Sequence, residues 1–326
     1  MKPRILRTDT EVHITGNTLN DLRRVADVVT SESNDEETLA RDAEDADLII
    51  VSCFTKITAR VIETARKLKG IVKYGVGVDN IDLEAATRRG VLVVNCPEYG
   101  AETIADHAFT LMLCLARKII EIDKEMRRRA WIWPSPEYMG VDMFGKTLGV
   151  IGLGRIGRAM TNRAGGFGMR ILVHDPYVTD ELIRQYNGEA VSLDDLLRRS
   201  DFVSIHCIST SETRGLIGES ELKKMKKTAF IIDVSRGAII DEAAIITALK
   251  EGWIAGAGFD VFSEEPLSLD HPLLGMDNVI LTPHLAWYTK GAFDRLEREA
   301  VQRALEILQG KRPKNIMNAQ VLEKLR

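Results

Sequence analysis

The sequence is poor in cysteine and in long apolar runs, and it has no excess of basic charge. Its four cysteines, Cys53, Cys96, Cys114 and Cys207, show no CxxC or other metal-ligand spacing, so we expect free thiols and no metal site. No run approaches about 18 apolar residues, which argues against a membrane span. The net charge of −4 argues against a nucleic-acid-binding surface.

A targeting signal is also missing from the first residues. MKPRILRTDT has no apolar stretch like that of a secretory signal peptide, and together with free thiols this predicts a cytoplasmic location. The chain has 326 residues, of which 45% are hydrophobic and 28% are charged, as in an ordinary globular protein. That length is too great for one ordinary core and predicts two domains.

One segment has the pattern of a dinucleotide-binding turn. Residues 148–157 read LGVIGLGRIG, an apolar run that leads into Gly152, Gly154 and Gly157. The first glycine permits a tight turn, the second lets the backbone approach a pyrophosphate, and the third lets the next helix pack on the sheet. Asp175 lies 18 residues beyond Gly157, at the end of another apolar run, where a carboxylate can accept hydrogen bonds from a ribose diol. The pattern predicts a strand at 147–151, a helix at 155–167 and a strand at 170–174.

Short β-type runs alternate with helical patterns on both sides of this segment, which predicts parallel sheets with crossover helices. In the first hundred residues we expect strands at 4–7, 47–52, 70–73 and 91–94, and helices at 35–43, 58–69 and 82–89. Later strands are expected at 202–206, 229–234, 254–259 and 279–281, with helices at 193–199, 219–225, 241–250 and 291–308. A helix over 101–118 is apolar enough to be buried between domains or subunits, and residues 126–146, with Trp131 and Trp133, show no clear period.

The position of the glycine turn, almost halfway along the chain, indicates an inserted domain. The first sheet has no closing element of its own, and the last helix follows the end of the second sheet. We therefore expect residues 101–288 to form the dinucleotide domain, and residues 1–100 and 289–326 to form the other. Two chain crossings would make a hinge, with the substrate between the domains.

Two residues at predicted strand ends suit the reduction of a carbonyl next to a carboxylate. Arg236, in DVSRGAIID, has a guanidinium that can bind a carboxylate through two hydrogen bonds. His284, in TPHLAW, offers a side chain whose ordinary pKa suits acid/base chemistry near neutrality. The remaining histidines are expected at the surface, in the core or beside the cofactor; they are His13, His107, His174, His206 and His271.

A histidine acid/base commonly needs a carboxylate that orients its ring. Asp260, Glu264 and Glu265, in FDVFSEEPL, are all candidates, and spacing alone does not choose between them. In the first domain, the glycine-rich turn at residues 75–79 follows a predicted strand and presents N–H groups that suit a substrate carboxylate; a plain structural turn explains it equally well.

These segments together resemble the D-2-hydroxyacid dehydrogenase family, in order and over nearly the whole chain. The matching segments are KYGVGVDNID, the glycine turn, HDPY, DVSRGAIID, FDVFSEEPL and TPHLAW. The resemblance implies an α/β fold of two doubly wound parallel-sheet domains, with a Rossmann NAD domain inserted into a flavodoxin-like substrate domain. It also implies a cytoplasmic homodimer that uses NAD.

The resemblance further implies roles for particular residues. Arg236 would bind the substrate, Glu265 would be the carboxylate partner, and His284 the acid/base. Val76, Gly77 and Trp287 would line the substrate. Residues expected near the cofactor are Gly152, Gly154, Arg155, Ile156, Gly157, Asp175, Cys207, Thr213, Val234, Arg236, Asp260 and His284.

The implied reaction is the reversible reduction of a 2-keto acid to a D-2-hydroxy acid. Phosphoglycerate dehydrogenases of this family often carry an arginine where this chain has Ser52, although a second basic position is kept as Lys73. Phosphoglycerate is therefore a less favoured substrate, but it remains an alternative. The run Ala286-Trp287-Tyr288 is similar to the C-terminal binding proteins, which suggests a dinucleotide-sensing binding protein as another alternative.

Overall fold

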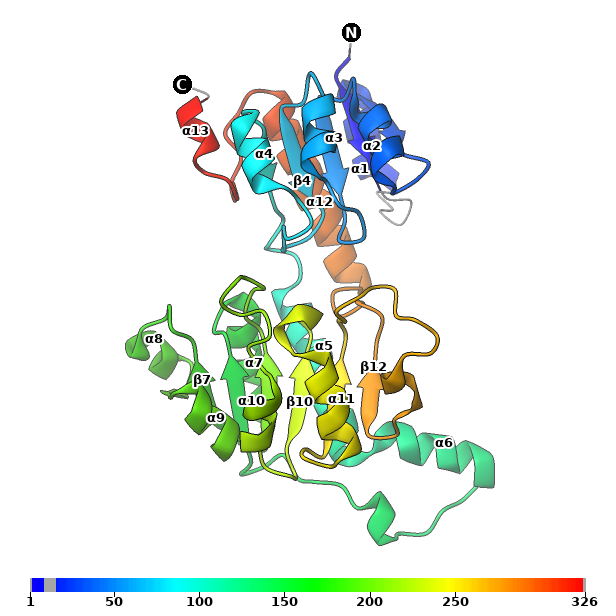
Figure 1. The fold of residues 1–326 in the computed structure, drawn as a ribbon, viewed down its shortest axis with the longest axis vertical. Coiled ribbons are helices and arrows are strands. Elements are labelled where there is room, and N and C mark those ends of the chain that lie inside the picture. The colour runs from blue at the N-terminus through cyan, green and yellow to red at the C-terminus, as the bar shows by residue number, and fades with distance from the viewer. Residues whose placement is uncertain (1, 9–15, 325–326) are drawn as a thin grey trace. The chain divides into compact units, whose positions relative to one another are not determined.

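The computed structural model describes residues 2–8 and 16–324, which form two compact units. Unit 1 contains residues 1–100 and 289–326, and unit 2 contains residues 101–288. Each unit has one parallel sheet with helices packed on it (Figure 1). The predicted α/β fold with two parallel sheets is therefore confirmed.

The sheet of unit 1 has five parallel strands in the order β2-β1-β3-β4-β5, which is the flavodoxin-like order. The strands are β1 (Arg4–Arg7), β2 (Asp27–Thr30), β3 (Leu48–Val51), β4 (Gly70–Lys73) and β5 (Leu92–Val94). The helices are α1 (Gly16–Val25), α2 (Glu36–Ala43), α3 (Ala59–Thr64), α4 (Leu83–Arg88), α12 (Lys290–Leu308) and α13 (Val321–Lys324). Because α12 packs against β3 and β4, the end of the chain completes the fold of its first hundred residues.

The sheet of unit 2 has seven parallel strands in the order β12-β11-β10-β9-β6-β7-β8. The strands are β6 (Thr147–Ile151), β7 (Arg170–His174), β8 (Gly188–Ala190), β9 (Phe202–Ile205), β10 (Phe230–Asp233), β11 (Gly256–Phe259) and β12 (Val279–Leu281). The α-helices are α5 (Ala101–Arg117), α6 (Ile119–Arg129), α7 (Arg155–Gly166), α8 (Asp180–Gln185), α9 (Leu193–Arg199), α10 (Glu219–Lys224) and α11 (Glu242–Lys250). The strand order reverses between β6 and β9, and ligands of doubly wound sheets bind at such a switch point.

The inner strands are apolar because helices cover both faces of the sheets. Every residue of β6 and β9 is buried, as expected for strands with no solvent-facing side. Several helices begin at a side chain that accepts a hydrogen bond from the first turn, among them Asp82 before α4, Asp241 before α11 and Thr289 before α12. These caps fix the residue at which each helix begins, and so they also fix where the loop before that helix ends.

The structure differs from the sequence prediction mainly at short or edge elements. The edge strands β2 and β8 and the helices α1, α6, α8 and α13 were not predicted. Helix α3 ends at Thr64 instead of reaching residue 69, because Ala65 leaves the helical conformation. The 101–118 helix is interrupted at Lys118, which has a φ of 51°, and α6 continues to Arg129 inside the segment predicted to lack a period.

Helix α5 was expected to be buried between domains or subunits. Within unit 2 its buried face packs against α7, β10 and β11, while Asp106 and Thr110 are exposed, and its place between domains or subunits stays a prediction. Among the described residues no helix is long and apolar enough to cross a membrane.

Candidate active site

The glycine turn lies where β6 ends at the switch point of the unit 2 sheet. Gly152 has a φ of 92°, and a Cβ there would lie 2.6 Å from the backbone nitrogen of Cys207, which follows β9. A larger residue would be strained and would also collide with the neighbouring loop. Gly152 therefore allows the loops after β6 and β9 to approach each other.

The next two glycines shape the start of α7. Gly154 is the N-cap residue, is exposed, and has no neighbouring atom within 4 Å of an added Cβ, and no side chain caps the helix. No side chain therefore caps the start of α7, and an uncapped helix N-terminus suits a phosphate group. A Cβ on Gly157 would lie 2.1 Å from the carbonyl oxygen of Gly152, so only glycine lets α7 pack this close to the turn.

Asp175 follows β7 and connects the second strand to the glycine turn. Its Oδ2 accepts a hydrogen bond from the N–H of Leu153 at 2.7 Å, and its Oδ1 accepts one from Tyr177 at 3.0 Å. Beside it is a cavity of about 320 Å³, lined also by His174, Asp180 and Ser192. The glycine turn, the uncapped helix and this carboxylate beside a cavity fit the pyrophosphate and ribose of a dinucleotide.

Other residues expected near the cofactor lie on loops at the same edge of the sheet. Arg155 and Ile156 start α7, Cys207 follows β9, and Val234 follows β10. Thr213 fixes the turn after β9, since its hydroxyl donates to the carbonyl of Ile208 at 2.5 Å and accepts from the N–H of Thr210 at 2.8 Å.

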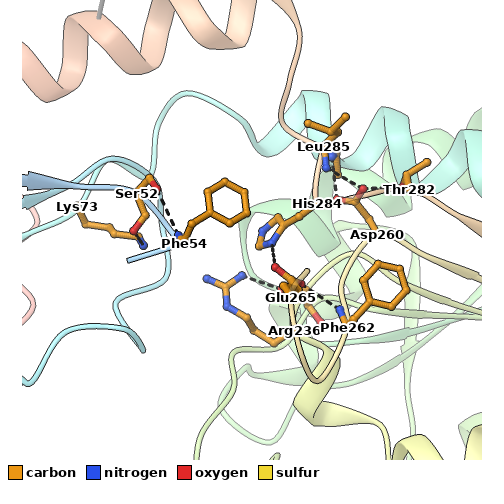
Figure 2. Close-up of polar contacts among 12 residues, drawn as sticks. Ser52, Phe54, Lys73, Arg236, Asp260, Phe262, Glu265, Thr282, His284 and Leu285 are labelled. Carbon is orange, nitrogen blue, oxygen red and sulfur yellow. Dashed lines mark hydrogen bonds and ion pairs between the residues drawn. The ribbon is translucent and has the colours of Figure 1, made fainter. Parts of the chain in front are cut away.

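The structure selects one of the three acids that the sequence left open as partners of His284. Nδ1 of His284 lies 2.7 Å from Oε2 of Glu265, and the two side chains are 17% and 24% exposed (Figure 2). The other oxygen of Glu265 accepts a hydrogen bond from the N–H of Phe262 at 3.0 Å. Burial opposes ionisation of Glu265, but the hydrogen bond and charge interaction with His284 outweigh it and lower its pKa. The arrangement leaves Nε2 as the ring nitrogen of His284 that points away from Glu265.

Asp260 acts on the backbone around His284 rather than on its ring. His284 has a φ of 56°, a conformation that costs a residue with a side chain about 1–3 kcal/mol. Its N–H donates to the carbonyl of Asp260 at 2.7 Å, and the carboxylate of Asp260 accepts from the N–H groups of Leu285 and Ala286 at 2.9 and 2.8 Å (Figure 2). These bonds hold the strained turn in place and so fix the direction of the imidazole.

His107, for which a surface or core role was expected, joins this network. It lies on α5, and its Nε2 is 2.9 Å from the hydroxyl of Thr282, which in turn donates to Asp260 at 2.5 Å. Because His107 and Thr282 are 175 residues apart in the chain, this contact could not be predicted from the sequence.

Another histidine, His13, lies outside the described residues.

Arg236 lies on the turn after β10, and that turn packs against the loop of Glu265. A Cβ on Gly237 would lie 2.0 Å from the carbonyl carbon of Phe262, so glycine is required for this close approach. Arg236 is partly buried and donates from one guanidinium nitrogen to the carbonyl of Ser235 at 2.7 Å. The turn thereby brings Arg236, Glu265 and His284 into one region of unit 2, which Figure 2 shows.

Asp233, at the end of β10, is a buried carboxylate that the sequence did not single out. Its Oδ1 accepts hydrogen bonds from both the N–H and the hydroxyl of Ser235, at 2.8 and 2.5 Å, which shapes the turn before Arg236. Burial raises the pKa of Asp233 to about 7, although these hydrogen bonds oppose the effect. Burial also acts on His206, where it disfavours the charged imidazole and lowers the pKa to about 3.

The residues expected to bind substrate from unit 1 follow β4. The carbonyl of Val76 accepts a hydrogen bond from Asn95 at 2.6 Å, and Gly75, with a φ of 141°, begins the turn that presents Val76 and Gly77. Lys73 is only 2% exposed, and its ammonium donates to the carbonyl of Ser52 at 2.6 Å and to Asn80 at 2.8 Å. This lysine therefore stabilises a loop and is not an exposed cation.

Trp287 was expected to line the substrate. It is partly buried and packs against the core of unit 2 that includes Ala286. The ring of Tyr288 lies edge-on to it, with the ring centroids 5.1 Å apart.

Within residues 2–8 and 16–324, no group of three or more His, Cys, Asp or Glu side chains is placed to hold a metal ion.

The doubly wound sheet, the glycine turn and the histidine–carboxylate pair define the class of nicotinamide-dinucleotide oxidoreductases. Residues 109–286 match the model of the D-isomer specific 2-hydroxyacid dehydrogenase NAD binding domain, and this chain belongs to that family. It is an NAD-dependent oxidoreductase acting on 2-hydroxy acids, and the residues that match the NAD-binding model lie within unit 2.

Similar proteins share most of the chain. It is 42% identical over 282 residues to a glyoxylate reductase of Korarchaeum cryptofilum, covering 86% of this chain and 85% of that one. It is 41% identical to a D-3-phosphoglycerate dehydrogenase of Methanocaldococcus jannaschii, covering 91% of this chain and 56% of that enzyme. The crystal structure of a D-lactate dehydrogenase from Aquifex aeolicus, complexed with NAD and lactic acid, has a TM-score of 0.86 and 28% identity over 98% of each chain.

Proposed function

We propose that this protein reduces a small 2-keto acid, such as glyoxylate, to the corresponding 2-hydroxy acid at a site built on Arg236, Glu265 and His284. The observation that carries the proposal is the 2.7 Å hydrogen bond between Glu265 and His284, on loops that Gly237 and Asp260 hold in place. When bound, NADH supplies the hydride that reaches the keto carbon. The similarity to a glyoxylate reductase of similar length supports a small substrate.

In this reaction His284 would deliver the proton to the substrate oxygen. Glu265 accepts the Nδ1 proton, so the proton that moves is the one on Nε2 of His284. The hydrogen bond to the carboxylate also orients the imidazole ring for this transfer. In the reverse direction, neutral Nε2 would take the hydroxyl proton from a 2-hydroxy acid.

Arg236 would hold the substrate carboxylate and so place the carbonyl. A guanidinium binds a carboxylate through two parallel hydrogen bonds, which fixes the plane of the substrate as well as its position. The N–H groups of Val76 and Gly77 would bind the same carboxylate from unit 1, and Trp287 would contact the substrate side chain. These assignments rest on the family resemblance together with the turns described above.

The cofactor would bind along the edge of unit 2 at which its strands end. Gly152, Gly154 and Gly157 leave room for the pyrophosphate, and Asp175 would accept hydrogen bonds from the ribose diol. The negative charge of Asp175 disfavours a 2′-phosphate, so we propose a preference for NAD over NADP. The loops carrying Arg155, Ile156, Thr213, Cys207, Val234 and Asp260 would complete the cofactor site.

Phosphoglycerate is a less suitable substrate for this site. The position at which the related phosphoglycerate enzymes often carry arginine is Ser52, and the neighbouring Lys73 is buried and engaged in hydrogen bonds. A phosphate would therefore meet no exposed cation from either position. The similarity to the Methanocaldococcus jannaschii enzyme keeps 3-phosphohydroxypyruvate in the test set.

The test is the oxidation of NADH with glyoxylate, hydroxypyruvate, phenylpyruvate and 3-phosphohydroxypyruvate, each over a range of concentrations. We expect the highest kcat/KM with glyoxylate or hydroxypyruvate and the lowest with the phosphorylated acid. Tight NADH binding without turnover of any acid would favour the alternative of a dinucleotide-sensing protein. A preference for 3-phosphohydroxypyruvate would contradict the role given to Ser52 and Lys73.

We also propose that the protein acts as a homodimer in the cytoplasm, where its four free cysteines stay reduced. Large apolar side chains are exposed on α6 and the segment after it, including Trp131 at 61% and Trp133 at 77%. Exposed aromatic side chains gathered on one segment favour association with a partner. Sedimentation at micromolar concentration should show a dimer, and a Trp131→Ser/Trp133→Ser variant should shift it toward monomer; a monomeric wild-type chain would refute the proposal.

A further inference from the structure

Unit 2 contains a second hollow, at the edge of the sheet where its strands begin. It has a volume of about 740 Å³ and is lined by the first residues of β6, β7 and β8, by the end of α9, and by Lys226, which follows α10. Pockets for small molecules have volumes of about 300–1,000 Å³. The hollow is therefore large enough for a ligand the size of a common metabolite.

The lining of this basic pocket carries four cations and one carboxylate. The cations are Arg170, Arg198, Arg199 and Lys226, and the carboxylate is Glu189. Such a concentration of positive charge contrasts with the whole chain, whose net charge is −4. Excess charge in a concave surface attracts ligands of the opposite sign.

Two of the four cations already have acidic partners. Arg199 makes two hydrogen bonds of 2.8 Å with Glu189, and Lys226 lies 2.8 Å from Asp201. The hydrogen bond from Arg199 lowers the pKa of Glu189, so Glu189 is charged at neutral pH. These pairs form the wall of the pocket.

Arg170 and Arg198 make no such close pair, although Arg198 interacts with Asp194 through charge at longer range. In the described part of the chain neither guanidinium has a carboxylate within 4 Å, and Arg170 makes only a long hydrogen bond of 3.4 Å to the carbonyl of Gly145. Arginine in the last turn of a helix also complements the helix dipole, which explains Arg198 at the end of α9. That effect does not explain Arg170, which starts a strand, nor why both line one hollow.

The basic pocket is separate from the nucleotide site. Strand β6 starts in the pocket at Thr147 and ends just before Gly152, and β7 starts at Arg170 and ends just before Asp175. At about 3.3 Å per residue, the two sites lie roughly 16 Å apart along the same strands. A ligand in the pocket would therefore leave the nucleotide edge of the sheet open.

We propose that the basic pocket binds a small molecule with two or more phosphate or carboxylate groups, at Arg170 and Arg198. Both guanidiniums present planar donor pairs that match either oxyanion. Arg199 and Lys226 are each paired with an acid, so the excess positive charge of the pocket comes from Arg170 and Arg198. The site is a second, non-catalytic anion site on the NAD-binding domain.

The test is isothermal titration of inorganic pyrophosphate, and separately of citrate, into protein saturated with NADH at constant ionic strength. Saturation with NADH blocks the glycine turn, where a phosphate would otherwise bind, and constant ionic strength removes general screening. We expect one saturable site with a Kd below about 1 mM for at least one probe. The stronger probe shows whether phosphate or carboxylate groups are preferred.

Two variants and one control locate the site. Arg170→Gln/Arg198→Gln should weaken binding at least tenfold, whereas Glu189→Gln should strengthen it several-fold because the only acid of the lining is neutralised. Arg184→Gln removes an exposed arginine of α8 that pairs with Glu181 outside the pocket, and should change the Kd less than twofold. The proposal is overturned if neither probe binds the NADH-loaded protein, or if the double variant binds as tightly as the wild type while melting at the same temperature.

Discussion

Glu265 and His284 are joined by a hydrogen bond of 2.7 Å, although 19 residues separate them in the chain. Each is fixed from a second direction, Glu265 by the N–H of Phe262 and the His284 turn by Asp260. A general acid works best when its direction is set before the substrate arrives. The pair therefore has the preorganisation that proton transfer to a bound 2-keto acid needs.

Loss of the Glu265 charge should slow turnover without weakening substrate binding. In Glu265→Gln the side chain keeps its size but no longer places a negative charge against Nδ1 of His284, so we expect kcat for glyoxylate to fall about 10²-fold while KM changes less than threefold. Steady-state kinetics with NADH measures both. Glu264→Gln is the matched control, since Glu264 makes no hydrogen bond to His284, and it should behave as wild type. Equal kcat values for the two variants would remove Glu265 from the mechanism.

Asp175 should set the choice between NADH and NADPH. Asp175→Ala removes both the acceptor for the ribose hydroxyls and the charge that repels a 2′-phosphate, so the KM for NADH should rise about tenfold and that for NADPH should fall. The measurement is kcat/KM for each cofactor at saturating glyoxylate. Glu181→Ala removes a nearby exposed charge of α8 and should leave the ratio unchanged. An unaltered ratio in Asp175→Ala would show that specificity lies elsewhere.

Asp233 should make the protein less stable as the pH rises. Burial raises its pKa to about 7, above the ordinary 3.8, so the folded chain holds more protons than the unfolded chain between about pH 4 and 7. The stability that this group contributes is therefore present at low pH and is lost as the pH rises toward 7. Asp233→Asn keeps an oxygen for Ser235 but does not ionise.

The free energy of unfolding should follow that sign. Between pH 5 and 8, Asp233→Asn should gain roughly 2 kcal/mol relative to wild type, as measured by urea denaturation at each pH. Asp277→Asn, at an exposed position, should show no such trend. A constant difference between Asp233→Asn and wild type across this range would show that Asp233 is ionised in the folded protein.

Much of unit 2 was predictable because its signals are local. The glycine turn, the strands on either side of it and Asp175 lie within 29 residues, and each has a distinct backbone requirement. The structure shows these requirements as the positive φ of Gly152 and the 2.1 Å contact that a side chain on Gly157 would make. Local patterns of this kind do not depend on the rest of the fold.

Contacts between distant segments were not predictable. The sequence could not choose among Asp260, Glu264 and Glu265, because the direction of each side chain depends on how the 260–265 loop packs against Gly237. It also missed the contact between His107 and Thr282, which exists only because α5 packs beside β12. Edge strands such as β8 were missed because three residues, GEA, carry no periodic signal.

The most direct test compares wild type with His284→Ala, measuring NADH oxidation with glyoxylate and, separately, NADH affinity by fluorescence. We expect kcat to fall about 10³-fold while the Kd for NADH changes less than threefold, because the proposed mechanism takes the proton from His284 and holds the cofactor at the glycine turn. Near-normal turnover of glyoxylate and the other 2-keto acids by His284→Ala would contradict the account.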